Sequence, residues 1–212
     1  MTDRRTLVAL LALLCLVLAG CGGTELIRRS GPTQTVDRPT PSSGVLSTPV
    51  AATKNTTRIP GADPITFAAL VSLAVFPSAA PGTHPTAVAL TSSTDWQAAL
   101  AASVLMGGPL HAPLLFSVGA TMPPISEAAL PKLAPSGARA ANGTQVVRIG
   151  DVPKPAGDRL ASISGNDPYT LAAGIDRFVS AAQNHTSRDV IIASGTDPAY
   201  AMPAAGYAAE SG

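Results

Sequence analysis

A six-residue stretch occurs twice in this chain, and this duplication limits how the chain can fold more than any other feature. The first copy, residues 59–64, reads Ile-Pro-Gly-Ala-Asp-Pro, and the second, residues 163–168, reads Ile-Ser-Gly-Asn-Asp-Pro. Their glycines are 104 positions apart. Further on, Val-Ala-Leu-Thr-Ser at 88–92 matches Val-Ile-Ile-Ala-Ser at 190–194, at an offset of 102. A near-constant offset with the same order of elements predicts two tandem repeats of one structural unit.

Each copy carries the signals that start a helix. The glycine allows a tight turn. Asp63 and Asp167 stand where an N-cap side chain accepts a free backbone N–H. Pro64 and Pro168 then occupy the first helical position, where a missing N–H costs nothing. Capping accounts for both aspartates, and a ligand role for Asp63 and Asp167 is kept as the alternative.

Residues 1–20 are predicted to be a lipoprotein signal peptide. Arg4 and Arg5 are followed by an apolar run at 6–19, which is shorter than the roughly 20 residues that span a bilayer. The sequence Leu-Ala-Gly-Cys at 18–21 resembles the bacterial lipobox. The resemblance implies that Cys21 receives a diacylglycerol and a fatty acid such as palmitate and becomes the mature N-terminus, attached to the membrane. The alternative is an ordinary signal peptide with an incidental cysteine.

Residues 21–57 are predicted to be a disordered tether rich in Thr, Pro and Ser, because they contain too few periodic apolar residues to form a core. Without the leader, the chain has 12 basic and 12 acidic side chains, so there is no positive field to hold nucleic acid. Loss of Cys15 with the leader and acylation of Cys21 leave no thiolate for a metal. With isolated histidines and no catalytic constellation, we expect no metal, no cofactor and no enzymatic activity.

The folded part, from residue 58 on, alternates between helical and strand patterns. Helices are expected at 64–76, 96–106, from 123 onward, 168–183 and 198–210, and strands at 86–90, 112–116, 144–150 and 189–193. Pro131 is expected to shorten or break the third helix. Continuous apolar strands alternating with helices predict an α/β fold with a parallel sheet covered by helices on both faces. The second repeat is incomplete, which leaves two alternatives. Either the sequence is a fragment of a longer protein, or the partial second repeat completes the sheet of the first repeat.

Four segments resemble the type 2 cell-wall-binding repeat. They are Thr-Arg-Ile-Pro-Gly-Ala-Asp at 57–63, Asp-Trp-Gln-Ala-Ala-Leu-Ala-Ala at 95–102, Leu-His-Ala-Pro-Leu-Leu at 110–115 and Ile-Ala-Ser-Gly at 192–195. The resemblance implies Rossmann-like or Toprim-like α/β units, with a first repeat at 58–162 and a partial second repeat at 163–212. Such repeats are non-catalytic, usually occur in threes that pack around one another, and anchor proteins to anionic polymers of Gram-positive cell walls.

The resemblance also implies ligand-binding residues. The family's arginine before the Gly-Ala-Asp turn falls on Arg58, and its polymer-binding Pro-Ile-Leu-Leu segment falls on Pro113, Leu114, Leu115 and Phe116. The family's arginine after the aspartate is proline in both copies. Two alternatives stay open: 113–116 as a buried strand, and Arg58 as an ordinary surface or ion-pair residue.

The expected function is that of a lipid-anchored lipoprotein on the outer face of the cell membrane. It would contact an anionic cell-wall polymer or organise the envelope, and packing of its repeats could build a homo-oligomer. One alternative is a lipid-anchored solute-binding receptor, and another is a protein-interaction module that kept the fold and lost polymer binding. An enzyme of unknown class is a third, supported only by the versatility of α/β folds.

Overall fold

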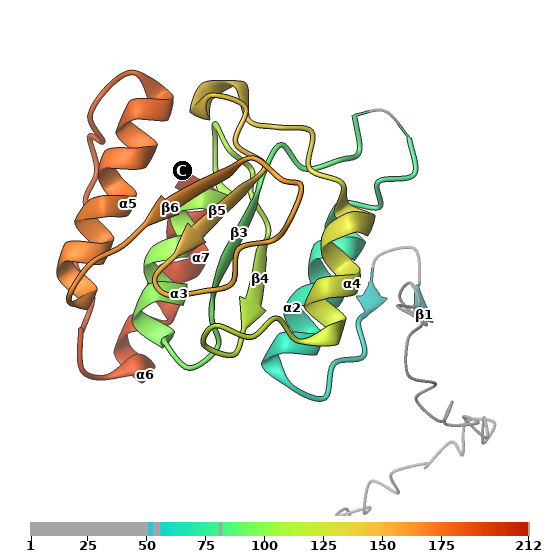
Figure 1. Ribbon diagram of the computed structural model, residues 1–212. Helices are drawn as coiled ribbons and strands as arrows, with labels where there is room; N and C mark the ends of the chain where they lie inside the picture. Colours follow the sequence, from blue (N-terminus) through green and yellow to red (C-terminus); the bar gives the residue numbers. More distant parts are fainter. Residues whose placement is uncertain (1–50, 53–55, 81, 212) are drawn as a thin grey trace, which may run out of the picture. The chain divides into compact units, whose positions relative to one another are not determined.

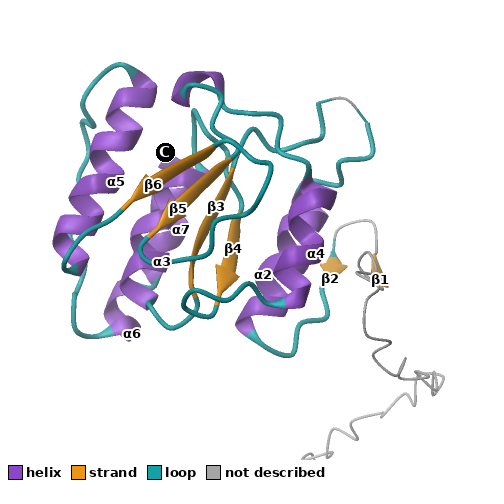
Figure 2. Cartoon of the chain, in the orientation of Figure 1, coloured by secondary structure: helices purple, strands orange, loops and turns teal. Residues whose placement is uncertain are grey.

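The computed structural model describes residues 51–52, 56–80 and 82–211, all within one compact unit. The predicted leader, Cys21 and most of the tether lie outside these residues. The elements, drawn in Figures 1 and 2, are β1 (Ala51–Ala52), β2 (Thr57–Arg58), α2 (Pro64–Val75), β3 (Val88–Ser92), α3 (Trp96–Ala102), η2 (Ser103–Met106), β4 (Leu114–Ser117), α4 (Pro124–Leu133), η3 (Arg139–Ala141), β5 (Val146–Ile149), β6 (Leu160–Ile163), α5 (Pro168–Gln183), α6 (Pro198–Ala201) and α7 (Pro203–Ser211).

Four strands form a parallel sheet in the order β4-β3-β5-β6. Across the sheet, Leu90 of β3 lies beside Leu115 of β4 and Arg148 of β5. The crossover from β3 to β4 runs through α3, and the crossover from β4 to β5 runs through α4. The crossover from β5 to β6, residues 150–159, contains no helix. The α/β fold with a parallel, helix-covered sheet is therefore confirmed.

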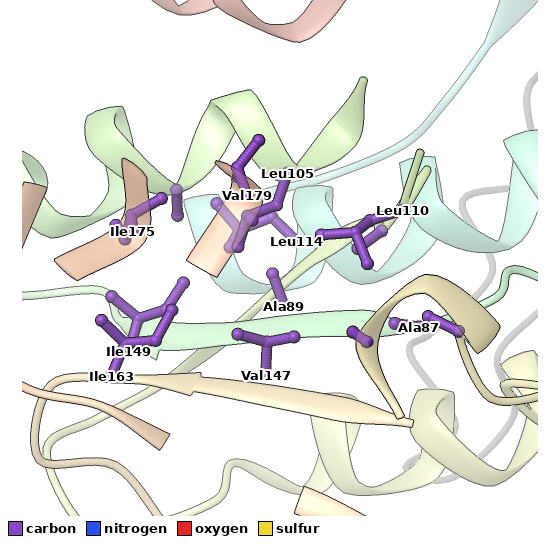
Figure 3. Packing of buried hydrophobic residues seen from close by; sticks show 14 of the residues in the cluster. Ala87, Ala89, Leu105, Leu110, Leu114, Val147, Ile149, Ile163, Ile175 and Val179 are labelled. Atoms are coloured by element: carbon purple, nitrogen blue, oxygen red, sulfur yellow. The ribbon is translucent and has the colours of Figure 1, made fainter. Parts of the chain in front are cut away.

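Helices cover both faces of the sheet (Figure 2). On one face, α3 and α5 pack on the strands through Ala98, Ala102, Leu171, Ile175 and Val179 (Figure 3). On the other, α2 and α4 contribute Ala69, Ala129, Leu130 and Leu133. Side chains along a strand point alternately to the two faces, so Val88 and Leu90 join one cluster and Ala89 the other. The many alanines let helices approach the strands closely, which fits a chain with only 4% aromatic residues.

Both turns need their glycine because the turn lies too close to the following helix for a side chain. A left-handed backbone is not the reason. Neither Gly61 nor Gly165 has a positive φ angle. A Cβ added to Gly61 would lie 2.8 Å from the side chain of Phe67. A Cβ added to Gly165 would lie 2.4 Å from the backbone nitrogen of Leu171. In each copy the turn therefore folds back against the first turn of its own helix.

The prediction for Pro131 is wrong, because α4 continues through it to Leu133. Proline at this position removes the N–H that would bond the carbonyl of Glu127. Pro131 is exposed, so water can satisfy that carbonyl, whereas Leu130 and Leu133 on either side are buried in the core. Packing of those two leucines outweighs the lost hydrogen bond, and the helix ends at Ala134 in the left-handed conformation.

The predicted strand at 189–193 is also wrong. These residues form no strand, and the side chains of Val190 and Ile192 are 81% and 92% exposed. A strand needs a neighbour for its backbone groups, and the segment is no part of the β4-β3-β5-β6 sheet. Its ends are held by polar contacts instead. Ser187 Oγ donates to Asp176 Oδ1 at 2.9 Å, and Gln97 Nε2 donates to the carbonyl of Gly195 at 3.2 Å.

Smaller differences concern the edges of elements. The helix expected at 96–106 tightens to a 3-10 helix after Ala102. The helix expected at 198–210 is interrupted at Met202, because Pro203 has no N–H to continue it. The strand β6 was not predicted, because it is short and carries the polar Ser162 in its middle.

Candidate functional site

The residues predicted for a ligand site lie in different environments. Cys21 lies outside the described residues. Arg58 is exposed, in β2. Pro113, Leu114 and Leu115 are buried, the two leucines being 8% and 0% exposed as the start of β4. Leu114 and Leu115 pack into opposite faces of the sheet. The Pro-Leu-Leu segment is therefore core, and its side chains are not available at the surface for a ligand.

Asp63 has its carboxylate committed to the helix that it caps. Oδ1 accepts hydrogen bonds from the backbone N–H groups of Ile65 at 3.0 Å and Thr66 at 2.9 Å, and Oδ2 accepts from the Thr66 hydroxyl at 2.7 Å. The backbone N–H of Thr66, followed by its hydroxyl, lowers the pKa of Asp63. Since hydrogen bonds stabilise the ionised form, these contacts give Asp63 a structural role.

The same arrangement recurs at three other helix starts. Asp167 accepts from the backbone N–H groups of Tyr169 and Thr170 at 2.8 and 2.9 Å, and the N–H of Thr170, followed by its hydroxyl, lowers the pKa of Asp167. Asp95 caps α3, and Asp197 caps α6, each through one backbone N–H at 2.9 Å. A helix N-terminus is a ready site for an external anion. In α2, α3, α5 and α6 a carboxylate of the chain itself already fills it.

Arg148 is a buried cation that fastens the helix-free crossover between β5 and β6. Its side chain is only 7% exposed. Nε donates to the carbonyl of Pro153 at 2.8 Å, Nη1 donates to the hydroxyl of Ser162 at 2.8 Å, and Nη2 donates to the carbonyl of Val152. A buried charge is costly unless its hydrogen bonds are made. Here neutral oxygens make them, so Arg148 holds the loop where a crossover helix would otherwise pack.

A groove of about 610 Å³ lies between α4 and this crossover. Four prolines line it, together with Glu127, Lys154 and Asp158. Burial raises the pKa of Asp158. Because the groove carries charges of both signs, it offers no single electrostatic preference to a charged ligand.

A second, open hollow of about 380 Å³ is lined by two arginines, Arg139 and Arg159. We call it the arginine hollow; its other lining residues are Ser136, Gly137, Gly143 and Gln145. Both arginine side chains are exposed. Within the described part of the chain, no carboxylate lines the hollow, and neither guanidinium forms a hydrogen bond or ion pair. The hollow is therefore a local concentration of free positive charge.

Gln145, directly before β5, joins the segments that build the arginine hollow. Its backbone N–H donates to the carbonyl of Arg159 at 2.8 Å, and its side-chain Oε1 accepts from the backbone N–H of Arg159 at 3.1 Å. Its Nε2 donates to the carbonyl of Pro135 at 2.9 Å. These three bonds fix the backbone of Arg159 beside the loop that carries Arg139.

A tight turn gives the Arg159 side chain its place. Asn142 and Gly143 both have positive φ angles, of 55° and 76°, and the N–H of Gly143 donates to the carbonyl of Ala138 at 2.8 Å. A Cβ on Gly143 would lie 2.7 Å from Nη1 of Arg159. The guanidinium of Arg159 therefore lies against Gly143 in the space that a side chain at this position would occupy.

The arginine hollow was not predicted from sequence, because its residues come from segments 136–145 and 159. The available signals were the Asn-Gly turn at 142–143 and two arginines in a chain with only 13% charged residues. Residues 56–211 carry eight Lys or Arg and ten Asp or Glu. The folded part is thus slightly acidic, and attraction for an anion must come from local geometry and not from overall charge.

Comparison of the chain with protein-family models, with curated proteins and with solved structures finds no match in any of the three. In the part of the chain that the structure describes, no group of three or more His, Cys, Asp or Glu side chains could hold a metal ion. None of the described helices is long and apolar enough to cross a membrane.

Proposed function

We propose that this protein is a lipid-anchored, non-catalytic module of the cell envelope that binds an anionic cell-wall polymer on the outer side of the membrane. The lipobox-like sequence ending at Cys21 supports the lipid anchor, and the resemblance to type 2 cell-wall-binding repeats supports the polymer. The single observation that carries the proposal is the arginine hollow, where two exposed guanidiniums have no carboxylate beside them among the described lining residues. Guanidinium groups are suited to oxyanions because they donate paired N–H groups in a fixed fork.

The structure changes which residues are assigned to binding. We assign binding to Arg139 and Arg159, with Arg58 as a further exposed cation. The Pro-Leu-Leu segment is buried and Asp63 caps a helix, so neither is part of the proposed site. Proline stands where the family has an arginine after the turn, at Pro64 and Pro168. Arginines in the hollow would therefore compensate for those that the duplicated turns lack.

Co-sedimentation with purified cell-wall sacculi tests this function. The full chain in detergent is mixed with sacculi before and after their anionic polymers are stripped, at low and high salt. We expect binding that stripping abolishes and that salt weakens. Arg139→Gln and Arg159→Gln should each weaken it about five- to tenfold, the value of one solvent-exposed hydrogen bond of roughly 1–1.4 kcal/mol.

Arg177→Gln is the matched control, since Arg177 is an exposed arginine on α5 and its replacement removes the same charge. It should leave binding unchanged. Equal binding to stripped and unstripped sacculi would contradict the proposal, and so would equal losses in the hollow variants and the control.

A further inference from the structure

We infer that the arginine hollow is a phosphate-binding site, and that a phosphate group, not a carboxylate, is the part of the ligand that it holds. This inference rests on the proposed function, because it names the chemistry of the polymer that the module would bind. It follows from the number and availability of the side-chain donors in the hollow.

Among the side chains that line the hollow, the free hydrogen-bonding groups are mainly donors. Both side-chain polar atoms of Gln145 are engaged, Oε1 with the N–H of Arg159 and Nε2 with the carbonyl of Pro135. The hydroxyl of Ser136 donates to the carbonyl of Pro85 at 3.3 Å. What remains is the two guanidiniums, each with up to five N–H groups and no acceptor. A ligand that satisfies them must be rich in acceptor oxygens and negatively charged.

Two arginines favour phosphate over carboxylate. The two oxygens of a carboxylate lie in one plane and are matched by a single guanidinium fork. Arg139 comes from η3, whereas Arg159 stands directly before β6, so two forks reach the hollow from separate elements. The tetrahedral oxygens of phosphate point in different directions and can accept from both.

Charge balance leads to the same assignment. Two guanidiniums of the same charge line the hollow, and no carboxylate among the described lining residues offsets them. A phosphate group carries a charge of about −1 as a diester and about −1.5 to −2 as a monoester at neutral pH. The hollow, of about 380 Å³, is open to solvent, so a phosphate within a polymer can reach it with its attached groups outside.

Three probes distinguish phosphate chemistry from charge alone and the polymer from a free ion. They are inorganic phosphate, poly(glycerol phosphate), and polygalacturonate as a carboxylate polymer at equal charge concentration. Each is titrated into the full chain at fixed ionic strength, and heat of binding and thermal stability are measured. We expect poly(glycerol phosphate) to bind, inorganic phosphate to compete with it and raise the melting temperature, and polygalacturonate to bind at least tenfold more weakly.

Variants of the two arginines test whether phosphate binds in the hollow. Arg139→Gln and Arg159→Gln should each weaken phosphate binding about five- to tenfold, and Arg177→Gln should not change it. Arg139→Lys and Arg159→Lys keep the charge but lose the fork, so they should bind phosphate more weakly than the wild type and more tightly than the glutamine variants. Thermal unfolding of each variant without ligand separates loss of binding from loss of folding.

The possible failures are distinguishable. If polygalacturonate binds as tightly as poly(glycerol phosphate) with the same dependence on Arg139 and Arg159, the phosphate assignment is overturned and polymer binding stands. If inorganic phosphate binds in the hollow but the protein does not bind sacculi, the phosphate site stands and the proposed function falls. If neither phosphate probe binds, the inference is overturned.

Discussion

The two regions of similar sequence share their local structure up to the end of the turn and the start of the helix, and differ in whether a strand follows that helix. In both, a glycine turn leads to an aspartate cap, a proline at the first helical position and a helix, α2 or α5. After the first helix, residues 88–92 form β3, which lies between β4 and β5. After the second, the matching residues 190–194 form no strand. A short motif can determine a cap by itself, but a strand forms only where the fold supplies neighbours.

The largest expected effect concerns the matched pair Leu90 and Ile192, which are 1% and 92% exposed. Leu90→Ala should lower the free energy of unfolding by about 2–5 kcal/mol, because it leaves a cavity between the sheet and the helices α2 and α4. Ile192→Ala should change it by less than about 0.5 kcal/mol. Urea denaturation measures both values. Similar losses would mean that residues 189–193 pack as a strand in solution.

The next largest effect is expected from replacing Gly61 or Gly165 by alanine, which compares how tightly the two turns pack. Gly165→Ala places a Cβ 2.4 Å from the backbone nitrogen of Leu171, whereas Gly61→Ala places one 2.8–2.9 Å from Cα, Cβ and Cδ2 of Phe67, so the clash is closer in the second copy. We expect losses of about 1–3 kcal/mol for overpacking, larger for Gly165→Ala. The order is read from thermal melts of the two single variants, and the reverse order would show that the turn of the first copy is the more rigid.

A smaller effect is expected from the caps. Asp63→Ala removes an acceptor for two backbone N–H groups and should cost about 1 kcal/mol. Asp167→Ala should destabilise more, because a capping box with Thr170 completes that cap and α5 buries Leu171 and Ile175. Chemical denaturation of the two variants and of Asp63→Asn, in which asparagine still caps, checks this. A loss in the asparagine variant equal to that in Asp63→Ala would contradict capping as the role.

The smallest expected effect is on the dependence of stability on pH. Hydrogen bonds lower the pKa of Asp63 and Asp167 below the ordinary value of 3.8. The stabilisation is therefore complete above pH 3.8 and is lost as the pH falls through the lowered values. Replacing both residues by asparagine should flatten the acid side of a stability–pH curve. An unchanged curve would show that other carboxylates control it.

Local signals in the sequence predicted the helix starts and the parallel sheet well, because the information is contained in neighbouring residues. The motif Asp-Pro gave the start of α2 and α5, and apolar runs gave β3, β4 and β5 within about two residues. The same local approach misjudged Pro131, where burial of Leu130 and Leu133 decides the outcome. It also misjudged residues 189–193, whose apolar sequence fits a strand but which lack a partner.

The candidate site could not be read from sequence for a related reason. The family resemblance implied a ligand-binding role for Pro113, Leu114 and Leu115, yet these are core residues. Arg139 and Arg159 were not predicted to bind a ligand, because nothing near either one in the sequence indicates a binding site. The fold brings them to one hollow through the bonds of Gln145. Long-range contacts of this kind leave no periodic trace in the sequence.

The exposed segment after α5 has a consequence for how the protein behaves at high concentration. Val190, Ile191 and Ile192 are apolar and β-branched, and uncovered segments of this composition promote pairing between chains and aggregation. Arg188 and Asp189 directly precede them and act as charged gatekeepers. We therefore expect that removing the charges of Arg188 and Asp189, which lie outside the core, lowers the solubility of the protein.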